Sequence, residues 1–177
     1  HVNIAHILLK QGDHVGATKH YELALQLNPN DNEIKHILSA ITKSSLPPKA
    51  PEEYLTHLFD QYAPYYDKHL TEQLKYNAPD IMLSLIEEDY NIQASWNILD
   101  LGCGTGLCGE KFKYMAQHLT GIDVAENMVK QAKQKNIYDK LIVNDIHAAI
   151  PLQSNIDLIT AADVFTYTGK LDSLISS

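Results

Sequence analysis

The chain has 177 residues, 45% of them hydrophobic and 20% charged, which excludes a largely disordered protein and predicts at least one packed core. Its 14 basic and 22 acidic residues give a formal charge of −8, which argues against nucleic acid and against anionic membranes as partners because both would be repelled. The sequence has no apolar run near the roughly 18 residues that span a membrane and no signal-like amino end, so we expect a soluble, cytoplasmic protein.

Residues 1–43 are predicted to form three short helices, because apolar and alanine positions recur there at helical spacing. Gly12 and Asp13 interrupt the first two helices, and Pro29 separates the second from the third. The segment KQGDHVGATKHYELALQLNPND resembles the tetratricopeptide repeat, with its turn glycine, two small residues, an aromatic residue and a closing proline. These positions are Gly12, Ala17, Ala24, Tyr21 and Pro29.

That resemblance implies an all-α segment that could bind a protein partner. A single repeat cannot bury its apolar face alone, and about three are normally needed. We therefore expect either further repeats before His1, which the abrupt helical start favours, or packing against the next domain.

Residues 44–51, with the sequence SSLPPKAP, have the serine and proline content of a linker. Residues 52–95 return to helical spacing and are divided by Pro64 and Pro79, which predicts about three helices. We expect four parts in all: a helical segment at 1–43, a linker at 44–51, a helical lid at 52–95 and a sheet domain at 96–177.

After Trp96 the pattern changes to short apolar runs that end near acidic residues, which predicts buried parallel strands. The expected strands cover residues 97–102, 119–123, 140–145 and 156–163. Helical patterns at 107–117 and 126–136 alternate with them, and the connection at 146–155 is expected to hold little helix. This alternation predicts an α/β fold with a doubly wound, mostly parallel sheet of about four strands.

The most informative stretch is LDLGCGTG, residues 99–106, where a strand should end and a helix begin. Alternating glycines at 102, 104 and 106 would let a ligand approach the backbone closely. Gly104, Gly106 and Gly109 also fit the dinucleotide pattern, and Asp123 follows Gly104 by 19 residues, so a nicotinamide cofactor stays open. Against it stands Asp100, whose carboxylate would repel a pyrophosphate but could serve an ammonium or a sulfonium.

Asp100 followed by the three glycines resembles motif I of class I methyltransferases. The resemblance implies a Rossmann-like fold and S-adenosylmethionine as cofactor, with Asp100, Gly102, Gly104 and Gly106 beside it. It also implies that Asp123 accepts hydrogen bonds from both ribose hydroxyls, as a carboxylate can. Further residues that it places around the adenine ring are Val124, Met128, Asp145 and Ile146.

After the fourth strand, the segment AADVFTYTG resembles the family's stretch beside the transferable methyl, where Ala161 and Ala162 would face the methionine part. Asp163 is a candidate catalytic residue there, and two weaker candidates follow it, Thr166 and Tyr167. The segment LFDQYAPYYDKHL, residues 58–70, is similar to the lid of many small-molecule methyltransferases.

Aromatic rings attract a sulfonium, so the tyrosines of that lid are further candidates: Tyr62, Tyr65 and above all Tyr66. We give Tyr66 two alternative roles, cofactor binding and catalysis. The histidines, His69 and His147 included, do not combine into a metal site, and Cys103 and Cys108 are interpreted as small residues near a tight turn.

The family's sheet has seven strands, whereas this chain ends soon after the predicted fourth, so we expect a fragment of a longer protein that lacks most of its substrate wall. The leading hypothesis is a methyltransferase acting on a small-molecule acceptor. Two others stay open: a tetratricopeptide interaction module with a degenerate methyltransferase fragment, and an NAD-dependent oxidoreductase.

Overall fold

The computed structural model describes residues 1–42, 51–90 and 95–168. They fall into two compact units, whose main parts are His1–Tyr54 and Leu55–Thr166. The predicted linker at 44–51 lies outside the described residues except for Pro51, so its role stays a prediction. None of the helices among the described residues is long and apolar enough to cross a membrane.

The first unit contains the three predicted helices, which are confirmed as α1 (Val2–Lys10), α2 (His14–Leu27) and α3 (Asn32–Thr42). Two aspartates begin the later helices: a side-chain oxygen of Asp13 accepts from the Gly16 amide at 2.9 Å, and Asp31 accepts from the Ile34 amide at 3.1 Å. The core of the unit consists of Ala5, Ala17, Tyr21, Ala24 and Ile34. The two alanines and the tyrosine of the repeat pattern are thus all buried.

The helical segment before the sheet runs without a break from residue 52 to residue 73 and resumes at residue 78. α4 (Glu52–Tyr62) passes through a 3-10 turn, η1 (Ala63–Tyr65), into α5 (Tyr66–Lys68) and a π turn, η2 (His69–Gln73). α6 (Ala78–Asp89) follows, and Pro79 lies in its first turn, where a missing amide costs nothing. The predicted divisions near Pro64 and Pro79 are therefore confirmed: α4 ends just before Pro64, and a break at residues 74–77 precedes Pro79.

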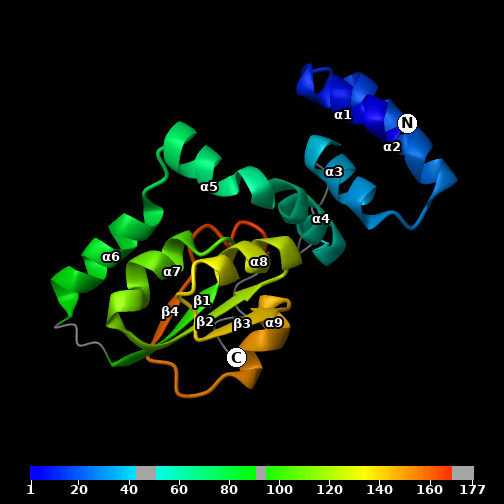
Figure 1. The fold of residues 1–177 in the computed structure, drawn as a ribbon. Coiled ribbons are helices and arrows are strands. Elements are labelled where there is room, and N and C mark those ends of the chain that lie inside the picture. The colour runs from blue at the N-terminus through cyan, green and yellow to red at the C-terminus, as the bar shows by residue number, and fades with distance from the viewer. Residues whose placement is uncertain (43–50, 91–94, 169–177) are drawn as a thin grey trace. The chain divides into compact units, whose positions relative to one another are not determined.

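The second unit contains a sheet of four parallel strands in the order β3-β2-β1-β4 (Figure 1). The strands are β1 (Trp96–Leu101), β2 (Ala116–Asp123), β3 (Lys140–Val143) and β4 (Leu158–Thr160). The predicted doubly wound sheet is confirmed, with different bounds: β2 begins three residues earlier than expected, and β4 keeps only three of its eight expected residues.

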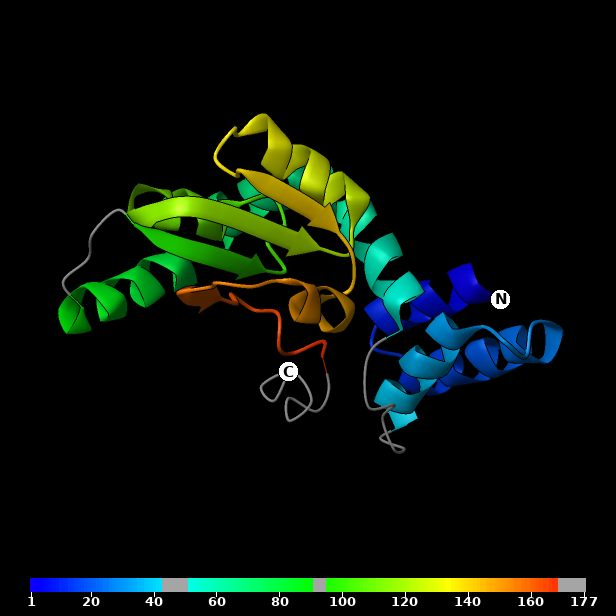
Figure 2. The same cartoon turned by 90° about the horizontal axis from the view of Figure 1, so that it is seen from below.

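Helices cover both faces of this sheet. Two of the connections are α7 (Leu107–Phe112) with its 3-10 turn η3 (Lys113–Met115), and α8 (Glu126–Gln134). The third, between β3 and β4, is the short α9 (Ile146–Ala149) with the turn η4 (Ile150–Leu152), which matches the expectation of little helix. Figure 2 shows α8 on one side of the strands and α9 on the other.

Each face of the sheet has its own core. One contains Ile98, Cys108, Phe112, Met115 and Leu119, and the other contains Leu99, Leu101, Ile122, Ile146 and Ala149. Alternate residues of β1 thus point to opposite faces, as expected of a strand buried on both sides. The chain runs outward from β1 to β3 and then returns to the other side of β1, so the strand order reverses between β1 and β4. Ligands of open α/β sheets bind at the carboxyl ends of strands at such a reversal.

Candidate functional site

The glycine-rich turn leaves the carboxyl end of β1, at the reversal of strand order. Gly102, Gly104 and Gly106 have φ angles of 58°, 53° and 93°, a backbone region that favours glycine. A Cβ atom on Gly102 would overlap Val164, and one on Gly106 would lie 3.1 Å from the Tyr138 ring. At Gly104 the nearest atoms to such a Cβ are both 4.0 Å away, so of these three glycines it is the one whose Cβ would meet only ordinary contacts.

Asp123 ends β2 and holds the turn from the next strand. One carboxylate oxygen accepts from the Gly104 amide at 2.8 Å, and the other accepts from the Ala125 amide, also at 2.8 Å. The residue is 9% exposed, and burial raises the pKa of its carboxyl while the backbone hydrogen bonds oppose that shift. The Val124 backbone also donates to this carboxylate, and the acceptance from ribose hydroxyls stays a prediction.

Asp100 lies beneath the turn and is 1% exposed. The Tyr138 hydroxyl donates to one of its oxygens at 2.6 Å, and the Thr160 hydroxyl donates to the other at 2.8 Å. Burial raises the pKa of this carboxyl, and the two hydroxyl donors lower it. The carboxylate thus accepts hydrogen bonds from two other segments of the protein, and its direct contact with a cofactor stays a prediction.

Tyr138 is a site residue that the sequence did not reveal. Its hydroxyl occupies the place that a Cβ on Gly109 would need, and its ring also lies against Gly106 and Gly121. Burial and the charge of Asp100 raise the pKa of this phenol. Gly109, which completes the dinucleotide pattern, is therefore explained by packing against Tyr138. The sequence shows the glycines but gives no sign of the ring that requires them.

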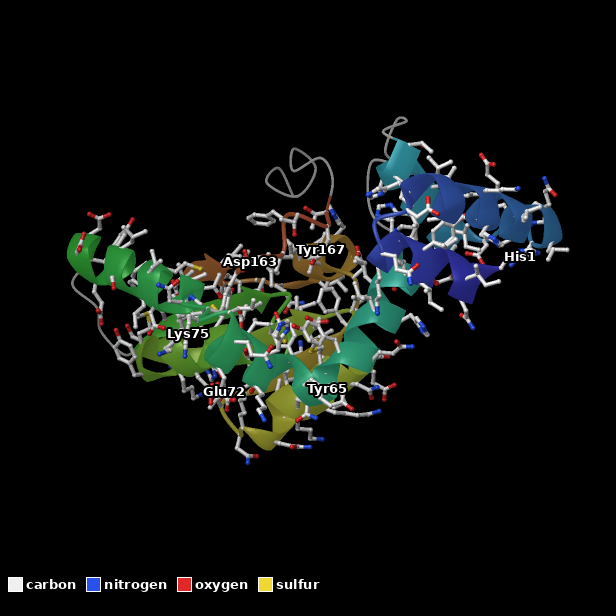
Figure 3. The ribbon with its side chains drawn as sticks, turned by 90° about the horizontal axis from the view of Figure 1, so that it is seen from above. His1, Tyr65, Glu72, Lys75, Asp163 and Tyr167 are labelled. Carbon is white, nitrogen blue, oxygen red and sulfur yellow. The ribbon has the colours of Figure 1, made fainter. Side chains whose placement is uncertain are left out.

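Tyr66 is the lid tyrosine that lies beside the glycine turn. One of its ring carbons is 4.0 Å from the position of a Cβ on Gly104, and its ring packs edge-on against Tyr62 with centroids 5.0 Å apart. The Tyr62 hydroxyl is hydrogen-bonded to Nδ1 of His69. Tyr65, in contrast, is 70% exposed (Figure 3). The preference for Tyr66 among the three tyrosines agrees with its position, although its contact with a cofactor stays a prediction.

The residues predicted around the adenine ring are partly or fully buried, or cap a helix. Met128 is 1% exposed and packs with Ala63 and Ala125 under lid aromatics, whereas Val124 is half-buried. A side-chain oxygen of Asp145 accepts from the His147 amide at 3.0 Å and so caps α9. Ile146 is 7% exposed and belongs to the core beside Leu99. Capping and packing account for these positions, and their roles toward a cofactor stay predictions.

The segment after β4 carries the acceptor-side candidates. Ala161 is half-buried and packs on the same core as Leu99, and Ala162 packs on the opposite one. Asp163 is exposed, has a φ angle of 57° and is labelled on this segment in Figure 3. It is hydrogen-bonded to the hydroxyl of Tyr76, whose pKa is raised by burial and by this bond. Tyr76 precedes α6 and was not singled out by the sequence.

The remaining sequence-level expectations concern metals and thiols. Among residues 1–42, 51–90 and 95–168 there is no group of three or more histidine, cysteine, aspartate or glutamate side chains that could hold a metal ion. Cys103 and Cys108 are free and buried, and burial raises the pKa of both thiols. The two cysteines are therefore buried thiols close to the turn, in line with the interpretation as small packing residues.

Comparisons with known proteins identify the two parts of the chain. A family model described as a methyltransferase domain matches residues 98–176, and one described as a tetratricopeptide repeat matches residues 1–31. Malonyl-(acyl-carrier protein) O-methyltransferase of Bacillus anthracis is 29% identical over 120 residues, which are 66% of this chain and 44% of the relative. The chain thus spans less than half the length of this curated relative.

Two solved structures share the fold. Magnesium protoporphyrin IX methyltransferase from Synechocystis, with bound S-adenosylmethionine, matches with a TM-score of 0.53 and 17% identity, over 73% of this chain and 68% of that one. A proposed S-adenosyl-L-methionine-dependent methyltransferase from Methanococcus maripaludis matches with a TM-score of 0.55 and 18% identity, over 66% of this chain and 56% of that one. Residues 98–176 are therefore similar to the methyltransferase-domain family, and residues 1–31 are similar to the tetratricopeptide repeat.

Proposed function

We propose that the protein catalyses methyl transfer from S-adenosylmethionine to a small-molecule acceptor. The observation that carries this proposal is the glycine turn at the carboxyl end of β1, whose Gly104 is bonded to Asp123 and flanked by Tyr66. The family match over residues 98–176 supports the same cofactor. A dinucleotide is disfavoured because Tyr138 accounts for Gly109, the glycine on which that alternative depends.

The residues of this chain would divide the work of binding. Asp123 would accept from a ribose hydroxyl with the acceptor capacity that its backbone donors leave unused. Tyr66 would place an aromatic ring over the turn, where ring faces attract a desolvated cation. When bound, S-adenosylmethionine supplies a methyl group on a positively charged sulfur. The nucleophile of the acceptor attacks the methyl carbon, and the sulfur leaves as a neutral thioether.

Little further chemistry is required of the protein beyond alignment and the exclusion of water. The leaving thioether needs no acid, so the only proton to move is the one that a hydroxyl or amine acceptor loses. Asp163, held by the Tyr76 hydroxyl, is the carboxylate that we propose for this proton. The matched relatives are named for malonyl-acyl-carrier protein and for magnesium protoporphyrin IX, and these different acceptors do not define the acceptor of this chain.

Isothermal titration of the chain with S-adenosylhomocysteine tests the proposal. We expect wild-type binding with a dissociation constant in the micromolar range, roughly −8 kcal/mol. Asp123→Ala should weaken it by about 100-fold or more, because the variant removes the acceptor of the ribose hydrogen bond and the brace of the turn. Asp89→Ala, an exposed carboxylate at the end of α6, is the matched control and should bind as the wild type does. Equal affinity of all three proteins would contradict the proposal.

For the first unit we propose a protein partner. The tetratricopeptide match and the exposed side chains of Ile7, Val15 and Leu27 support this proposal. Deletion of residues 1–42 should then abolish association with that partner while S-adenosylhomocysteine binding by the second unit persists. Loss of cofactor binding in the deleted protein would indicate instead that the repeat serves the methyltransferase domain.

A further inference from the structure

A cluster of polar side chains joins the lid to the glycine turn. The Thr105 hydroxyl donates to one carboxylate oxygen of Asp67, and the ammonium of Lys135 lies 3.0 Å from the other. The same ammonium lies 2.9 Å from a carboxylate oxygen of Glu110. These four residues come from α5, the glycine turn, the end of α8 and α7, and we call them the Asp67 clasp.

The clasp is better protected than an ordinary surface ion pair. Thr105 is 1% exposed, and the side chain of Lys135 is 19% exposed although it is charged. The two carboxylates are 43% and 45% exposed, so water screens the outer side of the cluster only in part. Both oxygens of Asp67 are engaged at once, one by a hydroxyl and one by an ammonium. This arrangement fixes the direction of the side chain as well as its position.

The clasp connects the direct chain neighbours of Tyr66 and Gly104. Asp67 follows Tyr66, and Thr105 follows Gly104, and a ring carbon of Tyr66 lies 4.0 Å from the position of a Cβ on Gly104. A second link holds the other end of the same lid stretch, because a side-chain oxygen of Asp60 accepts from the Asn127 amide at 2.7 Å. The lid aromatics between these links, Tyr62 and Tyr66, pack over Met128.

We propose that Asp67 is a positioning residue for cofactor binding, which holds Tyr66 over Gly104 through its bonds to Thr105 and Lys135. The inference rests on the proposed function, since Tyr66 matters only if a ligand lies at Gly104. A lid fixed in its bound position before the ligand arrives spares the ligand the cost of ordering it. Loss of the clasp therefore lowers affinity without removing any group that touches the cofactor.

Asp67→Asn is the direct test, because the amide oxygen can still accept from Thr105 whereas the ion pair with Lys135 is lost. We expect its dissociation constant for S-adenosylhomocysteine to rise about tenfold, as for one charge-assisted contact. Thr105→Val should give a similar loss, and Thr105→Ser, which keeps the hydroxyl, should restore affinity to within about twofold of wild type. The matched control is Asp80→Asn, which breaks an ion pair between α6 and Lys111 of α7, away from Gly104, and should leave affinity unchanged.

A double-mutant cycle separates positioning from general support of the fold. If Asp67 acts through Tyr66, then Asp67→Asn should change affinity less than about twofold in a protein that already carries Tyr66→Ala. A purely structural role would instead cost the same tenfold in both backgrounds. Thermal unfolding of each variant identifies any protein that is not folded at the temperature of the titration.

The results distinguish the failure of this inference from that of the proposed function. Wild-type protein that does not bind S-adenosylhomocysteine overturns both. Wild-type binding together with unchanged affinity in Asp67→Asn and Thr105→Val overturns the clasp alone, and so does a full tenfold loss in the Tyr66→Ala background.

Discussion

The buried carboxylate of Asp100 forms its hydrogen bonds with other side chains of the protein rather than with solvent. Its two oxygens accept from Tyr138 and Thr160, which belong to segments 38 and 60 residues further along the chain. A buried carboxylate that loses a donor keeps the full cost of its desolvation. The stability of the second unit should therefore depend on these two hydroxyl groups.

Tyr138→Phe should lower the free energy of unfolding by about 1–3 kcal/mol, because Asp100 loses a donor in a buried place. Urea unfolding followed by circular dichroism measures this change. Tyr114→Phe is the matched control: its hydroxyl donates to Glu87 at 2.5 Å, but the residue is 52% exposed and should change stability by less than about 0.5 kcal/mol. Equal effects of the two substitutions would contradict the role of Tyr138.

Two glycines of the turn should respond differently to alanine. Gly104→Ala should leave the protein folded at a cost of about 1 kcal/mol for its φ angle, yet weaken S-adenosylhomocysteine binding at least tenfold, because the methyl group enters the ligand space. Gly109→Ala should chiefly destabilise the fold, because its methyl group overlaps the Tyr138 hydroxyl. Titration and thermal unfolding of both variants check this, and the reverse pattern would show that the turn at Gly104 is not a binding site.

Individual elements are joined by polar contacts that hydrophobic periodicity does not predict. Asp139, just before β3, accepts from the Leu119 amide of β2 at 2.8 Å and from the Lys113 ammonium at 3.0 Å. The Leu119 hydrogen bond is the main cause that lowers the pKa of this carboxyl. The residue thus links two neighbouring strands and the end of α7 near the amino ends of the strands.

The pH dependence of stability should report this link. Because the pKa of Asp139 is lower in the folded state than in the unfolded chain, its stabilisation is complete above the unfolded value and disappears as the pH falls through the folded one. The stability lost in Asp139→Asn should therefore be constant above about pH 5 and shrink below about pH 4. Urea midpoints of both proteins between pH 3 and pH 7, about the range in which carboxyls titrate, measure it. A difference that grows toward low pH would contradict this assignment.

For the molecule as a whole, the sequence predicted the arrangement of the sheet well because the runs of apolar residues in NILDLG and LTGID are long enough to identify buried strands. It failed at β4, where only Leu158–Thr160 pair with the sheet. The chain leaves the sheet after them, and Val164 lies against Gly102 of the glycine turn. The sequence placed a division at Pro64 correctly, and the division is a 3-10 turn, which can accommodate a proline that an α-helix interior cannot.

The residues of the candidate site also divide into those that local sequence patterns predict and those that only long-range contacts reveal. The glycines and Asp123 could be located from the sequence because each follows directly from a local pattern, the end of an apolar run that predicts a strand. Tyr138, Thr160, Lys135 and Asp67 were not, because their roles arise from contacts 38 to 68 residues apart that no periodicity records. Asp100 combines both cases: its place in the motif is local, whereas its burial is a property of the packed sheet.

A crystal structure of the chain with S-adenosylhomocysteine tests the central claim most directly. The account predicts the ligand at the carboxyl ends of the strands, beside Gly104 and the Tyr66 ring, with its ribose donating to the Asp123 carboxylate. A ligand bound elsewhere, or a complex in which Tyr66 and the glycine turn close on each other and leave no room for it, would contradict the account.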